Sequence, residues 1–189
     1  MKEKVPKRKT ANRKTPKRTT LYEGKYKRLV VEDGWEFMEK VKNCQVVVVL
    51  AVNDDGKLLL VEQYRVPVGR SVIELPAGLA NDLDSHPDES LADAARRELL
   101  EETGYEAGEM KVLLRGPLAA AGVPDIMTLF RASRLRKAGP GGGDHTESIT
   151  VHEVPLAKIH DWIREKESAG FWVDPKVYAG LYLLAHIES

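Results

Sequence analysis

The hydrophobic pattern along the chain alternates between short extended runs and helical spacing, which predicts strands on both sides of one central helix. Residues 46–52 form the longest apolar run and predict a strand that is buried on both faces. Residues 53–56 (NDDG) are a strong hairpin signal, and residues 57–64 predict the returning strand. Further strands are predicted over residues 21–23, 26–32, 71–75, 110–114, 126–132 and 147–154, with an extended segment over 35–39.

The most regular pattern lies in residues 89–105, ESLADAARRELLEETGY, which predict a single helix. Ser90 is a candidate N-cap, and Asp93 stands three residues later, where a capping box takes an acid. Gly104 suits the position after the last turn, where φ is often positive. Two later helices are predicted over residues 155–166 and 174–187, the second with its apolar face on Val177, Leu181 and Leu184.

This order of elements predicts an α+β fold. Strands before, around and after a central helix, joined in part by hairpins, are typical of a mixed α+β sandwich. Strictly alternating strand–helix–strand units are missing, so a doubly wound parallel sheet is not expected.

The central helix carries three glutamates within an arc of about 100° on one side: Glu98, Glu101 and Glu102. Exposed carboxylates at this spacing repel one another weakly. A hard divalent cation reverses that sign, because it prefers carboxylate oxygen and brings its own positive charge. The helix therefore carries either a solvated acidic face or a metal site.

Composition bounds the class of protein. The 189 residues, 42% hydrophobic and 31% charged, suit one globular domain with a sizeable core. No apolar run approaches the ~20 residues of a membrane-spanning helix, and no secretory signal is evident near the N-terminus, so no membrane partner is expected. The single cysteine, Cys44, excludes an intramolecular disulfide framework and fits a reducing cytoplasm.

The net charge of zero conceals an asymmetry between the two ends of the chain. Residues 1–20 hold nine Lys/Arg and one acid, a formal charge of +8, and the remainder carries −8. This segment has no periodicity and is expected to be a basic, flexible arm. It has no aromatic residue to stack on bases, so a nucleic-acid partner is not expected. Residues 21–43 form an N-terminal strand region, and residues 44–189 the main domain.

From Gly78 onward the chain carries a set of residues at a specific spacing: Gly78, Glu89, Arg97, Glu98, Leu99, Glu101, Glu102, Gly104 and Tyr105. With these residues at this spacing, the chain resembles the Nudix hydrolases. One departure is the ten residues between Gly78 and Glu89, where the family has five, which lengthens a loop and leaves the helix register unchanged. The resemblance implies an α/β/α sandwich with a mixed sheet, preceded here by an N-terminal antiparallel strand region.

The resemblance also implies a cofactor, Mg2+ or Mn2+, and roles around it. Glu98 and Glu102 would be direct ligands, and Glu101 a ligand or a catalytic partner of the metal-bound site. The backbone carbonyl of Ala77 would complete the ligand set. Arg97 would orient the carboxylates, and Glu89 would act through water or as support. For Arg97 with Glu101 alone, the alternative is an ordinary helix salt bridge.

The stretch from Gln63 to Gly78 resembles the ADP-ribose pyrophosphatase branch of the family, on the residues QYR at 63–65 and IELPAG at 73–78. The resemblance implies that Arg65 contacts the substrate's phosphates, which suits its fork of donors. Arg70 is a further candidate for the same role. The alternative for both is a pair of solvated loop cations.

Trp35 and Glu36 stand where this branch has a base-stacking tryptophan and an adjoining acid. Stacking on a purine is physically reasonable for an exposed tryptophan, and core packing under the N-terminal strands is the open alternative. In the branch these strands exchange between subunits, which implies a homodimer in which Trp35 serves the partner's site.

The general base is expected outside the helix. Residues 137–146 are rich in glycine and predict a flexible loop, and Glu147 directly after it matches a base position of the branch. The alternative is a first strand residue pointing to solvent, and His145 is a chemically possible base. Residues 120–126 (AAGVPDI) lack a glutamate common in the branch, which leaves the sugar open.

Together these features predict metal-dependent hydrolysis of the pyrophosphate bond of nucleoside-diphosphate sugars, such as ADP-ribose or GDP-mannose, to a nucleoside monophosphate and a sugar phosphate. One alternative is another Nudix substrate: an mRNA cap, a dinucleoside polyphosphate or a damaged nucleoside triphosphate. Another is a module that binds nucleotide sugars without cleaving them.

Overall fold

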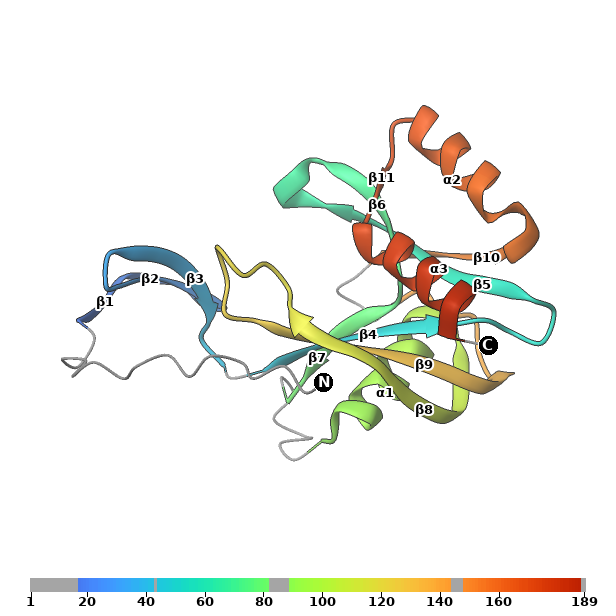
Figure 1. Cartoon of the computed structure of the whole chain (residues 1–189), viewed down its shortest axis with the longest axis horizontal. Coiled ribbons are helices and arrows are strands. Elements are labelled where there is room, and N and C mark those ends of the chain that lie inside the picture. The colour runs from blue at the N-terminus through green and yellow to red at the C-terminus, as the bar shows by residue number, and fades with distance from the viewer. Residues whose placement is uncertain (1–16, 43, 82–88, 144–147, 188–189) are drawn as a thin grey trace, which may run out of the picture. The chain divides into compact units, whose positions relative to one another are not determined.

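The structure, a computed structural model, describes residues 17–42, 44–81, 89–143 and 148–187 (Figure 1). It divides into two compact units. The N-terminal unit comprises the described residues up to 42 together with residues 119–124, and the large unit comprises the described residues of 44–118 and 125–187. Among the described helices, none is long and apolar enough to cross a membrane.

The N-terminal unit is a three-stranded antiparallel sheet with the order β1-β2-β3, formed by β1 (Arg18–Glu23), β2 (Lys27–Glu32) and β3 (Trp35–Lys40). β1 begins at Arg18, inside the segment that was expected to be a flexible arm. Ion pairs account for this difference, because Arg18 contacts Glu32 at 2.6 Å and Glu39 at 2.5 Å across the sheet. The loop of residues 119–124 joins the unit through a hydrogen bond from Met38 N to Gly122 O of 2.9 Å.

The large unit contains two four-stranded mixed sheets, with the orders β10-β5-β6-β11 and β7-β4-β9-β8. β6 and β11 are parallel, as are β4 and β9, and the other neighbours are antiparallel. The strands are β4 (Gln45–Ala51), β5 (Lys57–Arg65), β6 (Arg70–Glu74), β7 (Ala77–Ala80), β8 (Tyr105–Pro117), β9 (Ile126–Lys137), β10 (Ile149–Pro155) and β11 (Trp172–Val173). The helices are α1 (Leu91–Thr103), α2 (Ile159–Ser168) and α3 (Pro175–Ile187), with 3-10 turns η1 (Val66–Val68) and η2 (Leu156–Lys158).

Two hydrophobic cores lie on opposite faces of these sheets, and β4 contributes to both. Val47 packs with Leu99 of α1 on one face, while Val48 and Leu50 pack with Val177 of α3 on the other. Side chains alternate along a strand, so a continuously apolar run is needed to fill both cores. Figure 1 shows α1 and α3 on the two sides of β4 and β9. The prediction of a mixed α/β/α sandwich is therefore confirmed.

Several predicted boundaries differ from the structure for identifiable reasons. β8 and β9 extend well beyond the predicted 110–114 and 126–132, because polar residues pair across their outer ends while Tyr105, Ala107 and Leu135 pack on the core beside α1. Arg134 and Glu109 are 2.9 Å apart across these two strands. β7 and β11 were not predicted, since each has only a few residues. The helix predicted to start at residue 155 begins with η2, and α2 proper starts at Ile159.

Candidate active site

Helix α1 begins and ends as its sequence predicts. Ser90 Oγ accepts a hydrogen bond from Asp93 N at 3.1 Å and donates one to its carboxylate at 2.6 Å, so the predicted capping residues are confirmed. At the other end Gly104 has φ 74° and donates from its N–H to Leu100 O at 2.8 Å. A Cβ on Gly104 would lie 2.1 Å from Gly139 O, so this position requires glycine twice over.

The described part of the glycine-rich segment packs against the end of α1. Gly142 N donates to Glu102 O at 2.8 Å, and Gly143 N donates to Glu101 O at 3.0 Å. These bonds satisfy carbonyls that a helix end leaves without partners. The backbone of residues 138–143 therefore caps the helix turn that carries the glutamates, and the flexibility of this segment stays a prediction. Residues 144–147, with His145 and Glu147, lie outside the described residues, so the general-base prediction is untested.

Arg97 is the hub of the carboxylates. Its Nε and Nη2 bind the two oxygens of Glu89 at 3.1 and 3.2 Å, and Nη2 also donates to Leu79 O at 2.9 Å. Its Nη1 contacts Glu98 at 2.9 Å and Glu101 at 3.2 Å. Burial alone would lower the pKa of Arg97, but the bond to Glu89 and the surrounding carboxylates raise it. Arg97 therefore stays charged and links an acid before the helix to two acids on it.

Glu98 is the most perturbed of the glutamates. Its side chain is 12% exposed and accepts a hydrogen bond from Leu79 N at 3.2 Å. Burial raises its pKa to about 7, an effect that Arg97 opposes and the charge of Glu101 reinforces. A Cβ on Gly78 would lie 1.9 Å from the carboxyl carbon of Glu98, so glycine in β7 is what admits this carboxylate.

Glu102 and Glu101 sit in different surroundings. Glu102 is 3% exposed and accepts a hydrogen bond from Ala77 N at 3.0 Å. The side chain of Glu101 is 43% exposed. The structure therefore brings Ala77 of β7 next to the helix carboxylates, as the motif implies, although Ala77 contacts Glu102 through its N–H rather than its carbonyl.

The carboxylate oxygens suit a hard divalent cation by their chemistry. Two of the glutamates, Glu98 and Glu102, are nearly buried. Burial raises the pKa of Glu98, and a bound cation would favour its ionised form. In residues 17–42, 44–81, 89–143 and 148–187, no three acidic, histidine or cysteine side chains converge as a ready metal cluster. Glu98 and Glu102 turn instead to backbone N–H groups of β7. By its chemistry, this set of carboxylates fits a hard divalent cation.

Arg65 and Arg70 lie at the end of the β5–β6 hairpin, connected through η1. They are directly opposite one another in the antiparallel register. Arg65 Nε donates to Glu74 at 2.7 Å, and Glu74 is 13% exposed. Only two residues separate Glu74 from Ala77, so the hairpin leads directly into the strand beside the carboxylates.

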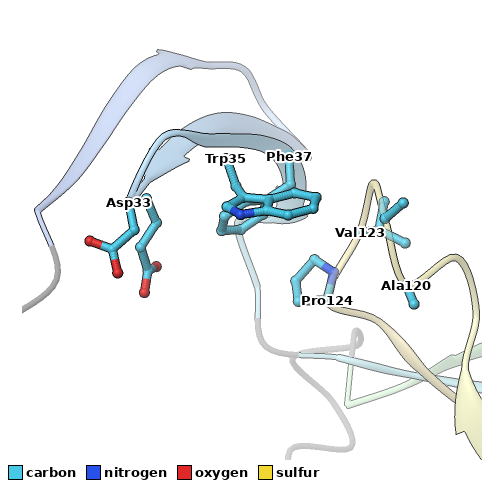
Figure 2. Close-up of a pocket in the computed structure, with 8 residues that line it drawn as sticks. Asp33, Trp35, Phe37, Ala120, Val123 and Pro124 are labelled. Atoms are coloured by element: carbon cyan, nitrogen blue, oxygen red, sulfur yellow. The ribbon is translucent and has the colours of Figure 1, made fainter. Parts of the chain in front are cut away.

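Trp35 lines a pocket of about 450 Å³ in the N-terminal unit (Figure 2). The side chain is 67% exposed, so the alternative of core packing is wrong. Figure 2 shows the indole alongside Phe37, with Pro124 on the facing loop. The pocket is lined by Glu32, Asp33, Trp35, Phe37, Ala120, Ala121, Val123 and Pro124.

Glu36 is not among the residues that line this pocket. Side chains alternate along β3, so Trp35 and Phe37 share one face and Glu36 points to the other. The acids that line the pocket are Glu32 and Asp33, which were not predicted from the sequence as site residues. The period of two along β3 was a signal for Phe37, but no local signal joins residues 119–124 to this sheet.

Comparisons with known proteins agree with the fold and identify the family. A NUDIX domain model matches residues 42–176. The chain is 31% identical over 182 residues to the ADP-ribose pyrophosphatase of Bacillus subtilis, covering 93% of this chain and 94% of that protein. It is 32% identical over 160 residues to the methanol dehydrogenase activator of Bacillus methanolicus, covering 81% and 84%. It is 34% identical over 118 residues to the GDP-mannose pyrophosphatase of Citrobacter koseri, covering 58% and 59%.

A solved structure described as an ADP compounds hydrolase superposes with a TM-score of 0.69 and 21% identity, covering 93% of this chain and 95% of that one. At this identity the likeness concerns the fold alone. The family model and the relatives that align along most of both chains go further. The chain belongs to the Nudix family.

Proposed function

We propose that the chain hydrolyses the pyrophosphate bond of nucleoside-diphosphate sugars, with a divalent metal, to a nucleoside monophosphate and a sugar phosphate. The observation that carries this proposal is the coupled set of glutamates around Arg97 beside β7. Relatives named ADP-ribose pyrophosphatase and GDP-mannose pyrophosphatase support the substrate class.

In this proposal the metal is Mg2+ or Mn2+, held by Glu98, Glu102 and Glu101 with the Ala77 carbonyl. When bound, it would neutralise phosphate charge and lower the pKa of a water molecule. Each protein group then has a separate task. Arg97 remains protonated and holds the carboxylates in place, with Glu89 as its buried partner.

The other groups act on the substrate. Arg65 and Arg70 bind phosphate oxygens through charge-assisted hydrogen bonds. Glu147 takes a proton from the water that attacks phosphorus, as the oxygen bridging the two phosphates leaves with one of them. Trp35 stacks on the base, with specificity set in the N-terminal unit. We further propose a cytoplasmic homodimer in which the N-terminal strands of one subunit serve the site of the other.

A substrate panel tests the proposal. The wild-type chain is incubated with ADP-ribose, GDP-mannose, a cap analogue, a dinucleoside polyphosphate and nucleoside triphosphates, with Mg2+, with Mn2+ or with EDTA. We expect nucleoside monophosphate and sugar phosphate from at least one nucleotide sugar, and no turnover in EDTA. Faster cleavage of the cap analogue, the polyphosphate or the triphosphates would contradict the substrate class. Binding of nucleotide sugars without turnover would contradict the enzymatic proposal.

A further inference from the structure

Two arginines stand opposite one another at the end of the β5–β6 hairpin. Arg65 and Arg70 form a register pair, so their Cβ atoms are about 5 Å apart and both side chains lie on one face of the sheet. Like charges in this position destabilise a strand pair. Arg65 is balanced by Glu74 at 2.7 Å. Arg70, the second arginine, requires a different stabilising contact.

The contact that the structure provides for Arg70 is aromatic. Its guanidinium carbon lies 5.3 Å from the centroid of the Trp172 ring, within the range of a cation–π contact. Among the described residues, no carboxylate lies within ion-pair distance of Arg70. The indole is 55% exposed although tryptophan is usually well covered.

The register of β11 explains how Trp172 reaches Arg70 from a distant part of the sequence. Trp172 pairs with Val72 in the parallel β6–β11 ladder, and paired residues of neighbouring strands point to the same face. Val72 is two residues from Arg70, so these side chains share that face too. Ile73 points the opposite way, into the core that contains α3. Arg65, Arg70 and Trp172 therefore lie together on the face turned away from α3.

This face leads to the carboxylates. Glu74, the partner of Arg65, lies three residues before Ala77, whose N–H binds Glu102. Three residues of extended chain span at most about 10 Å. The backbone of Glu74 therefore lies within about 10 Å of Ala77, and Arg65 reaches toward Glu74 from the hairpin.

We propose that Trp172 is a positioning residue, which holds the Arg70 guanidinium over its ring so that Arg65 and Arg70 together bind one phosphate group of the substrate. A guanidinium that stacks through its face keeps its N–H donors at the edge, where they can bind phosphate oxygens. An anion between the two arginines also removes their repulsion. This inference rests on the proposed function, since it assigns a further residue to the same substrate site.

The test separates cation–π support from mere packing. Trp172→Phe keeps an aromatic face in β11, and Trp172→Leu keeps apolar bulk without one. We expect Trp172→Leu to raise KM for the cleaved nucleotide sugar about two- to fivefold with kcat unchanged, and Trp172→Phe to stay closer to wild type. Tyr182→Leu is the matched control, because Tyr182 is an exposed aromatic that stacks on His186 of α3. It should leave KM unchanged.

A double-mutant cycle tests whether Trp172 acts through Arg70. In an Arg70→Ala background, Trp172→Leu should have no further effect on KM. The same variants are titrated with inorganic pyrophosphate and Mg2+ by calorimetry. This measurement tests the role of Trp172 even if no nucleotide sugar is cleaved. Absence of cleavage contradicts only the proposed function. Equal effects of the Phe and Leu substitutions, or additive effects of Trp172 and Arg70 on pyrophosphate affinity, would overturn the inference.

Discussion

The helix site of the large unit and the Trp35 pocket of the N-terminal unit are built on opposite physical principles. Around α1, charged groups are withdrawn from water and tied to one another: Glu89 is 7% and Arg97 15% exposed. In the pocket, an indole that is 67% exposed meets small apolar side chains of a loop. At the helix site each charged group depends on its partners, whereas the side chains of the pocket depend little on one another.

Because of this difference, the two regions suit different functions, one the reaction itself and the other recognition of the substrate. A buried charged network keeps its geometry because removing one member leaves another without its partner, which costs far more than an exposed contact. Such rigidity suits groups that must meet a reacting phosphate. An open aromatic pocket tolerates change, since losing it removes only contact area. It suits recognition of a variable part of a substrate.

The largest effect of a single substitution is expected at Arg97. Arg97→Ala leaves Glu89 nearly buried without its two-pronged partner, so we expect a loss of about 3 kcal/mol in the free energy of unfolding, measured with urea. Arg96→Ala is the neighbouring control. Arg96 is 40% exposed and pairs with Asp93, so its loss should cost about 0.5 kcal/mol or less. Equal shifts for both variants would refute the view that Arg97 is the hub.

The next effect is on catalysis. Glu102→Gln keeps size and an oxygen that can accept from Ala77 N, so the fold should persist while the charge is lost. We expect kcat for the cleaved nucleotide sugar to fall by at least about 100-fold. Glu106→Gln removes an exposed acid of β8 that pairs with Arg136, and its kcat should match wild type. Undiminished turnover by Glu102→Gln would remove this glutamate from the metal set.

Glu98 predicts how stability depends on pH. Its pKa of about 7 in the folded protein lies above the ordinary 4.5, so the folded state binds more protons between these values. The free energy of unfolding should therefore fall as pH rises from about 4.5 to 7, by roughly 2 to 3 kcal/mol in EDTA.

Two comparisons isolate this contribution from other titrating groups. Glu98→Gln should flatten this part of the stability profile. Added Mg2+ should stabilise the wild type more at pH 8 than at pH 6, because it favours the ionised carboxylate. A profile that is identical in wild type and variant would assign the slope to other groups.

The smallest effect is expected in the pocket. Trp35→Ala should raise KM about tenfold with kcat nearly unchanged, as expected for the loss of base stacking, and should leave the unfolding midpoint within experimental scatter. Glu36→Gln shows which face of β3 binds the base. Since Glu36 lies on the other face of β3, its KM should stay within about twofold of wild type if the base binds in the pocket of Figure 2. A large change in KM for Glu36→Gln would favour a site on that other face.

Much of the fold follows from patterns that are local in the sequence. The run at residues 46–52 is apolar at every position, which only a doubly covered strand requires, and the structure places cores on both of its faces. β7 was missed because AGLA has no β-branched residue and only four positions. The predicted lengths of β8 and β9 were too short because their outer residues combine cross-strand ion pairs with a few core contacts, which leave no continuous apolar run in the sequence.

The same division applies to the candidate site. Glu98, Glu101 and Glu102 could be found from spacing alone, because residues three and four apart share a helix face. Glu89 could be placed only from the resemblance, and its two bonds to Arg97 depend on how the chain enters the helix. Pro124 and Trp172 had no signal of their own in the sequence. Each acquires a place through a strand pairing or a loop contact between residues far apart.

The sequence by itself determined helix α1: its caps at Ser90 and Gly104, its register and the arc of three carboxylates. These depend on interactions within a few residues, which the order of amino acids specifies directly. Only the tertiary structure decided which backbone these carboxylates meet. Glu98 approaches β7 because Gly78 lacks a side chain, and the glycine segment caps the helix because its N–H groups reach the last carbonyls. Such contacts depend on long-range packing, which no local pattern encodes.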